Sequence, residues 1–161
     1  MYQRLRLLVT LISISAIVVL TSVISIAGDG IEGWEVGSEY NDLYNPKERD
    51  SIKGTIVKLV KITPLPGMAK GTGLILDEGG GDTVLIHICP QSFATARETG
   101  LKRGEWVKIK GAWADIGDDT VFIAAKIKKD GGYSFKIRLT SDGTPFWTMS
   151  AEQLAKERSS Q

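Results

Sequence analysis

An uncharged apolar run at the N-terminus is the feature that most restricts how this chain can fold. Residues 7–27 (LLVTLISISAIVVLTSVISIA) contain no Asp, Glu, Lys or Arg. As an α-helix, a run of this length extends about 30 Å, which matches the hydrocarbon core of a bilayer. We therefore expect a single transmembrane helix over 7–27, followed by a unit that folds in water.

The charges on either side of the run predict its orientation. Arg4 and Arg6 precede it, whereas acidic residues follow it and no Lys or Arg occurs before Lys47. Because basic flanks stay in the cytoplasm, we expect the N-terminus inside and the rest outside, with the span in the plasma membrane. The small residues Ser25 and Ala27 leave a cleaved signal peptide as the alternative, although the run exceeds the usual apolar core of such a peptide.

Hydroxyl side chains within the run suggest a second role for it. On a helix, one face would carry Thr10, Ser13, Thr21 and Ser25. Small residues on one face are typical of helices that pack together inside membranes. We expect this face to meet other transmembrane helices, with hydroxyls bonded only to their own backbone as the alternative.

Composition divides the remaining residues into a linker, one domain and a tail. Residues 28–46 are rich in glycine and acidic residues, yet they contain Trp34, Tyr40 and Tyr44. Spacers seldom carry aromatic side chains, so we expect these three to pack on the domain, a partner or the membrane interface. The predicted organisation is a cytoplasmic N-terminus, a membrane span, an acidic aromatic linker, a folded domain and a helical tail, at residues 1–6, 7–27, 28–46, 47–149 and 150–161.

Short alternating apolar segments separated by turn residues predict β-strands throughout the domain. The expected strands are 51–61, 71–77, 83–88, 105–115, 120–129 and 133–139. Pro90 suits a first helical turn and Gly100 a helix C-cap, so one helix is expected over 90–100, and a short terminal helix over 151–158.

This order of elements predicts an all-β fold with one short helix. Three strands, a helix and then further strands is the order of an OB-fold, in which a long bent first strand serves both halves of a small barrel. Gly54 and Gly111 lie where such a barrel needs corners. We expect a five- to six-stranded OB-fold barrel preceded by the single transmembrane helix.

Four stretches of the domain carry a family resemblance. They read GTIVKLVKITPLPGM, TVLIHICPQSF, LKRGEWVKIKGAW and IAAKIKK…FKIRLTSDGTPFW. Through them, residues 51–147 resemble a bacterial group of small extracytoplasmic OB-fold proteins, which often follow a signal peptide or an anchor. In that group the third strand runs into His-x-Gly-Pro; here His87 and Pro90 match, and Cys89 stands where glycine is usual. The resemblance implies a fold and little about activity.

A weaker resemblance concerns the periplasmic haem chaperones of cytochrome c maturation. They share the plan of an anchor followed by an OB-fold, and they end the barrel with His-x-x-x-Tyr, whose histidine binds haem covalently. At the aligned place Tyr133 matches, but Lys129 stands where the histidine is needed. Because lysine lacks imidazole chemistry, the resemblance does not carry haem-chaperone activity to this chain.

His87 and Cys89 are the one candidate pair of metal ligands. Two residues apart on a strand, they should point to the same face, where a thiolate and an imidazole suit copper or zinc. A third ligand is hard to find, and only Met68 and Met149 offer one. A buried thiol beside a hydrogen-bonded histidine is the favoured interpretation, and no cofactor is expected.

Lysines recur on the later strands and form the second candidate site. The basic residues are Lys108, Lys110, Lys126, Lys128, Lys136 and Arg138, with Trp113 and Phe122 near them. Such a surface resembles OB-folds that bind single-stranded nucleic acid. A solvated barrel exterior is the alternative, and the expected location outside the cytoplasm argues against nucleic acid as a partner.

The large aromatic side chains of the domain are expected in the core or at a barrel end: Trp106, Trp113, Phe146 and Trp147.

No catalytic residues are apparent. The chain has one histidine and one cysteine, no paired carboxylates suited to acid–base chemistry and no C-x-x-C-H haem site. We therefore expect a non-catalytic accessory or assembly subunit that presents its barrel to a larger membrane or electron-transfer complex. Its partner-binding residues would be the hydroxyl face, the linker aromatics, Trp147 and the loop residues Pro64, Pro66 and Met68. Metal or haem handling, and binding of oligosaccharide or nucleic acid, are the alternatives.

Overall fold

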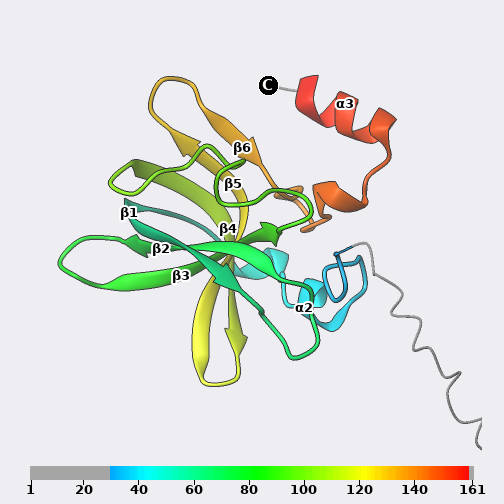
Figure 1. Cartoon of the computed structure of the whole chain (residues 1–161), viewed down its shortest axis with the longest axis horizontal. Coiled ribbons are helices and arrows are strands. Elements are labelled where there is room, and N and C mark those ends of the chain that lie inside the picture. Colours follow the sequence, from blue (N-terminus) through cyan, green and yellow to red (C-terminus); the bar gives the residue numbers. More distant parts are fainter. Residues whose placement is uncertain (1–29, 160–161) are drawn as a thin grey trace, which may run out of the picture.

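The protein is described by a computed structural model over residues 30–159 (Figure 1). The predicted N-terminus (1–6), the membrane span (7–27) and its hydroxyl face (Thr10, Ser13, Thr21, Ser25) lie outside the described residues and stay predictions. Within residues 30–159, no helix combines the length and the apolar character needed to cross a membrane.

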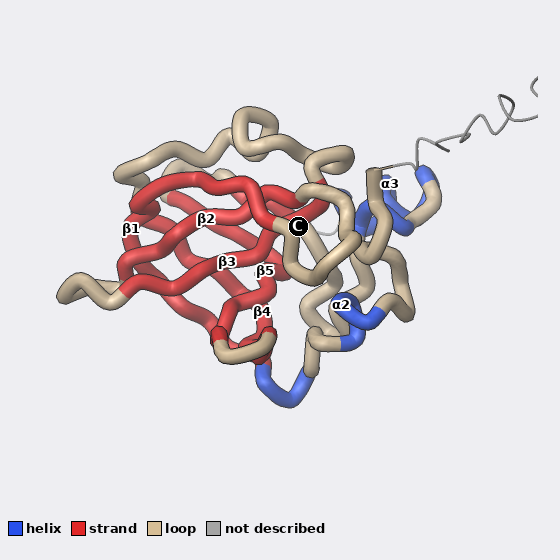
Figure 2. Tube along the Cα trace, turned by 60° about the horizontal axis from the view of Figure 1, so that its bottom comes forward, coloured by secondary structure: helices blue, strands red, loops and turns tan. Residues whose placement is uncertain are grey.

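Five strands close into a barrel. The sheet order is β3-β2-β1-β4-β5-β6, and β3 also pairs with β5, so the first five strands form a ring (Figure 2). All pairs are antiparallel except β3 with β5. The strands are β1 (Arg49–Ile62), β2 (Gly71–Asp77), β3 (Thr83–Pro90), β4 (Trp106–Ile116), β5 (Asp119–Lys129) and β6 (Ser134–Lys136). The expected all-β class is therefore confirmed, although β6 is shorter than the predicted strand 133–139.

The long first strand serves both halves of the barrel. Its beginning, from Arg49 to Thr55, pairs with β4, and its remainder, from Thr55 to Ile62, pairs with β2. Gly54 lies at the change of partner, where a Cβ would stand 2.2 Å from the carbonyl oxygen of Asp77. Only glycine permits this close approach of two backbones, which is how a barrel corner is made.

Hydrophobic side chains form two cores, one inside the barrel and one outside it. The interior core includes Ile56, Leu74, Ile109 and Phe122. The outer core lies on the outside of β4 and β5, where the strands present Ala112, Ala114, Val121, Ile123 and Ala125. A bulge between Lys110 and Gly111 interrupts the alternation, so Ile127 points inward while Ile123 and Ala125 point outward. Strict alternation along the strand would place all three on one face, and the bulge is the reason that it does not.

The segment before β1 covers the outer core. It contains two short helices, α2 (Glu39–Asp42) and η1 (Pro46–Glu48), with Ser38 and Asn45 as their N-caps. The aromatic side chains of Trp34, Tyr40 and Tyr44 lie in the outer core and are 0–4% exposed. Residues 30–46 are thus part of the folded domain, and of the alternatives for the aromatics, packing on the domain is the one observed.

The helix expected over 90–100 is absent, and two separate turns take its place. The carbonyl oxygen of Pro90 accepts hydrogen bonds from the amides of Phe93 and Ala94, and a new turn then begins at Thr95. The carbonyl of Ala94 accepts bonds from the Thr72 hydroxyl (2.8 Å) and the Cys89 thiol (3.4 Å), instead of one from an amide four residues on. A tertiary contact therefore stops the helix that the sequence favours.

The chain ends in a 3-10 helix and an α-helix. Phe146–Thr148 forms η2, and Ala151–Ser159 forms α3, which confirms the expected terminal helix. No residue of α3 is buried, and Figure 1 shows it beside the barrel near β6.

Candidate functional site

The structure gives His87 and Cys89 different partners. A bulge in the pairing of β2 with β3 places Cys89 opposite Thr72 and His87 opposite Gly73. Cys89 belongs to the interior core, and its thiol donates to the carbonyl of Ala94. His87 instead contacts Tyr40 of the covering segment. The simple alternation that predicted a shared face does not hold across this bulge.

Burial keeps both side chains uncharged at neutral pH. Burial lowers the pKa of His87 to about 4, and the positive charge of Arg138 adds to this effect. Burial also raises the pKa of the Cys89 thiol to about 12. Among residues 30–159, no three His, Cys, Asp or Glu side chains are grouped so that they could hold a metal ion. The two methionines considered as further ligands lie elsewhere, with Met68 against Gly33 and Met149 beside α3.

A polar cluster fixes the covering segment to the barrel. The Tyr40 hydroxyl lies 3.1 Å from Nδ1 of His87, and burial raises the pKa of Tyr40 well above its usual range. The indole Nε1 of Trp34 donates to the carbonyl of Ala69 at 2.8 Å, and that of Trp147 donates to the carbonyl of Trp34 at 2.8 Å. The covering segment is therefore held by directional bonds as well as by apolar contact.

Arg138 is buried at the centre of this cluster, which was not expected of a residue predicted on a basic surface. It is 2% exposed, and its Nη1 donates to Asn41 Oδ1 at 2.6 Å. Its guanidinium lies 4.6 Å from the ring centre of Trp147, a cation–π arrangement. Nε and Nη2 have no hydrogen-bond partner within the described residues, and burial lowers the pKa of Arg138. Arg138 thus contacts the covering segment through Asn41, the 139–144 turn through the carbonyl of Gly143, and η2 through Trp147, and it is not available at the surface.

Most of the predicted partner-binding residues in this region are structural. Trp34, Tyr40 and Tyr44 are buried, and Trp147 is half-buried between Trp34 and Arg138. They lie inside the domain because they shield the apolar outer faces of β4 and β5 from water. The burial of Trp34, Tyr40 and Tyr44 contradicts their assignment to a partner surface, whereas the assignment of Trp147 stays a prediction.

The loop between β1 and β2 remains partly open. Pro66 is exposed, Pro64 and Met68 are half-buried, and a hollow of about 220 Å³ lies on each side of the loop. His87 lines one hollow and Tyr40 the other. The prediction that this loop binds a partner is untested by these contacts.

Lysines occupy the part of the outer surface that the covering segment leaves free. Two rows run across the strands: Lys53, Lys108 and Lys128 lie opposite one another on β1, β4 and β5, and Lys110, Lys126 and Lys136 do so on β4, β5 and β6. We call these six residues the lysine face.

The lysine face is almost without compensating charge. The Nζ of Lys136 donates to the backbone carbonyl of Glu157 on α3. None of the other five lysines forms an ion pair with a carboxylate of the described chain. Partial burial and the neighbouring lysines 128, 136 and 110 lower the pKa of Lys126. Like charges directly opposite each other on a sheet are destabilising, so this arrangement costs the fold free energy.

Aromatic residues are placed differently from the prediction for this surface. Phe122 is fully buried in the interior core, and Trp113 packs against it at a ring distance of 4.9 Å. Trp106, expected in the core or at a barrel end, is 48% exposed and lies opposite Thr55 next to the first lysine row. The exposure of Trp106 could have been predicted from the sequence, because Trp106, Lys108 and Lys110 alternate along β4 and so point to the same face.

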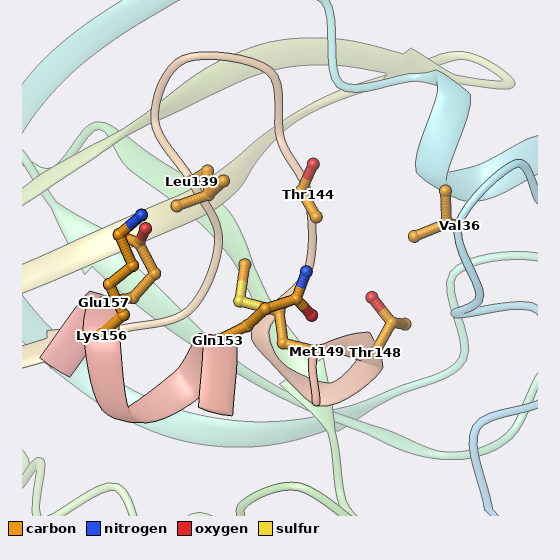
Figure 3. Close-up of a pocket in the computed structure, with 8 residues that line it drawn as sticks. All are labelled: Val36, Leu139, Thr144, Thr148, Met149, Gln153, Lys156 and Glu157. Carbon is orange, nitrogen blue, oxygen red and sulfur yellow. The ribbon is translucent and has the colours of Figure 1, made fainter. Parts of the chain in front are cut away.

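A hollow of about 440 Å³ lies at the C-terminal side of the domain. Figure 3 shows it between α3, η2 and the 139–144 turn, with Val36 of the covering segment across from Leu139. Its remaining lining is Thr144, Thr148, Met149, Gln153, Lys156 and Glu157. The volume falls in the range of small-molecule pockets.

Comparison with known proteins identifies the family. No match is found among curated proteins or among solved structures. The model of the MamS/MamX magnetosome protein family matches residues 48–133, which is just over half of the 161 residues. The matched stretch begins next to β1 and ends after β5, so it contains the whole closed barrel. The chain therefore belongs to the MamS/MamX magnetosome protein family, a bacterial group.

Proposed function

We propose that this protein is a membrane-anchored, magnetosome-associated accessory subunit without catalytic activity. Its barrel, which we assign to the OB type from its closed β1-β2-β3-β5-β4 ring, would dock onto an acidic surface of a larger membrane assembly. The family match supports the magnetosome association, and the apolar run 7–27 supports the anchor.

The lysine face is the observation that carries this proposal. On an edge strand, lysines serve to discourage pairing with other sheets. Here β4 and β5 have hydrogen-bonded neighbours on both sides, so that explanation does not apply to them. Repulsion among the lysines of each row is relieved when acidic groups approach, and the relief contributes to binding. None of the six lysines lines a hollow among those described, so the lysine face suits another macromolecule better than a small ligand.

Charge reversal on the lysine face tests the proposal. The full chain carrying Lys108→Glu and Lys126→Glu would be purified from its native membrane in mild detergent at low salt, next to the unaltered chain. The matched control is Lys58→Glu with Lys61→Glu, which makes the same charge change on the half of β1 that pairs with β2. Co-purifying proteins are quantified by mass spectrometry.

We expect a stoichiometric partner to co-purify with the unaltered chain and the control, and to be lost from the lysine-face variant. Raising the salt concentration should release the same partner, because exposed charges are screened. Equal recovery from all three chains, or recovery of a lone subunit from each, would refute the proposed docking role.

A further inference from the structure

Two large hydrophobic side chains stand out as exposed among residues 30–159, and they lie on surfaces of opposite charge. Trp106 is 48% exposed and Val36 is 60% exposed. Trp106 adjoins the lysine face, whereas Val36 belongs to the covering segment, which is acidic. Tryptophan is one of the residue types enriched at the hot spots of protein interfaces.

The surroundings of Trp106 are basic. It lies opposite Thr55 on β1, two residues along the strand from the pair Lys53 and Lys108. Lys128 continues that row on β5. A partner that covers Trp106 therefore has to offer an apolar cavity with negative charge beside it.

The covering segment and the neighbouring hollow have these properties. Val36, Leu139 and Met149 supply apolar lining to the hollow of about 440 Å³ (Figure 3). The segment exposes four carboxylates, and none of them forms an ion pair within the described chain: Glu32, Glu35, Glu39 and Asp42. Glu35 is next to Val36 in the sequence, whereas Glu39 lines the separate hollow beside Pro66. Lys156 and Glu157 also line the hollow, so its rim carries both charges on the α3 side.

We infer that a second copy of this chain docks head to tail, with Trp106 of one copy in the hollow beside Val36 of the next. The lysine face of the first copy then faces the carboxylates of the second copy's covering segment. A tryptophan side chain buries about 150–250 Å² when enclosed, enough to anchor such a contact. This inference rests on the proposed docking role of the lysine face and names one of its partners.

The two surfaces are different, so the contact is heterologous. Each copy that has used its Trp106 surface still has a free hollow, and the reverse is also true. Such contacts repeat into rings if the rotation closes and into chains if it does not.

Complementary variants test the inference. The full chain in mild detergent would be studied by sedimentation velocity over a range of concentrations at low salt. Trp106→Ala removes the anchor and leaves the hollow intact, whereas Val36→Arg blocks the hollow with a charge that repels the lysine face and leaves Trp106 intact. Both positions are exposed, and circular dichroism checks that each variant is folded. Lys61→Glu is the matched surface control.

The unaltered chain and the control should form concentration-dependent oligomers that dissociate as salt rises. Each of the two variants alone should weaken self-association about tenfold or more. An equimolar mixture of the two should give a one-to-one dimer and nothing larger, because only one complementary pair of surfaces remains.

Several results would overturn the inference. Oligomers of unchanged size in Trp106→Ala would do so, and so would a mixture that remains monomeric. An unaltered chain that stays monomeric at all concentrations would overturn it as well. If that chain still loses its other partner on reversal of Lys108 and Lys126, the proposed accessory role stands and the self-association alone is wrong.

Discussion

The single histidine makes the stability of this domain dependent on pH in a calculable way. His87 is 3% exposed, and burial next to Tyr40 lowers its pKa from 6.5 to about 4. The unfolded chain therefore binds a proton below about pH 6.5, while the folded chain keeps His87 neutral until about pH 4. Because the unfolded state binds more protons, the free energy of unfolding falls as pH falls through this window.

The size of the effect follows from the two pKa values. One pKa unit is equivalent to about 1.4 kcal/mol. Between pH 7.5 and pH 5, proton binding by the unfolded state lowers the free energy of unfolding by about 2 kcal/mol. With a denaturant slope of about 2 kcal/mol/M in urea, the unfolding midpoint should move down by about 1 M. Below pH 4 this group causes no further loss.

Urea unfolding of the full chain in non-ionic detergent at pH 7.5 and pH 5 measures this change. His87→Gln is the control, since glutamine can still accept a hydrogen bond from Tyr40 but does not titrate. The chain contains one histidine, so no other imidazole contributes to the difference between the two proteins. A shift below about 0.5 kcal/mol in the unaltered chain, or an equal shift in His87→Gln, would refute the reasoning.

Three further predictions concern the fold. Trp34→Ala should lower the free energy of unfolding by about 3–5 kcal/mol in urea titrations, since the indole is fully buried and donates to the carbonyl of Ala69 in the loop between β1 and β2; a loss under 1 kcal/mol would contradict this. Gly111→Ala should cost about 1–3 kcal/mol, because its Cβ would lie 2.2 Å from the backbone oxygen of Ile123; unchanged stability would show that the strands can move apart. Cys89 should not react with a disulfide reagent at pH 8 until the chain is unfolded, because burial raises its pKa to about 12; rapid reaction in the folded chain would contradict its placement.

The barrel could be predicted from the sequence because its signals are local. The strand predicted over 71–77 has the observed bounds of β2, and the corner at Gly54 lies where β1 changes partner. Alternating apolar residues and glycine turns carry this information within a few residues. The lysine rows were also visible as a set, since Lys108, Lys110, Lys126 and Lys128 occur in matched positions on β4 and β5.

The predictions that were wrong concern features that depend on contacts between distant segments. The helix over 90–100 is lost because Thr72 and Cys89 engage the carbonyl of Ala94, which the local sequence does not show. The sequence predicts Arg138 on a basic surface, yet the covering segment and Trp147 bury it. The cover over the outer face of β5 could have been predicted from the run Val121 to Ala125, because continuous apolar residues indicate a strand that is covered on both faces.

The docking of the covering segment changes how far the barrel can move from a membrane. Read as a free spacer, residues 28–46 would allow a reach of about 65 Å. In the structure the carbonyl of Gly30 already accepts a hydrogen bond from Ser92, and Trp34 is fully buried. With the predicted span ending at Ala27, about 10 Å of chain remains between bilayer and barrel. If the predicted span anchors the chain, the barrel stays close to the bilayer, and the acidic partner proposed above would present its surface near the lipid headgroups.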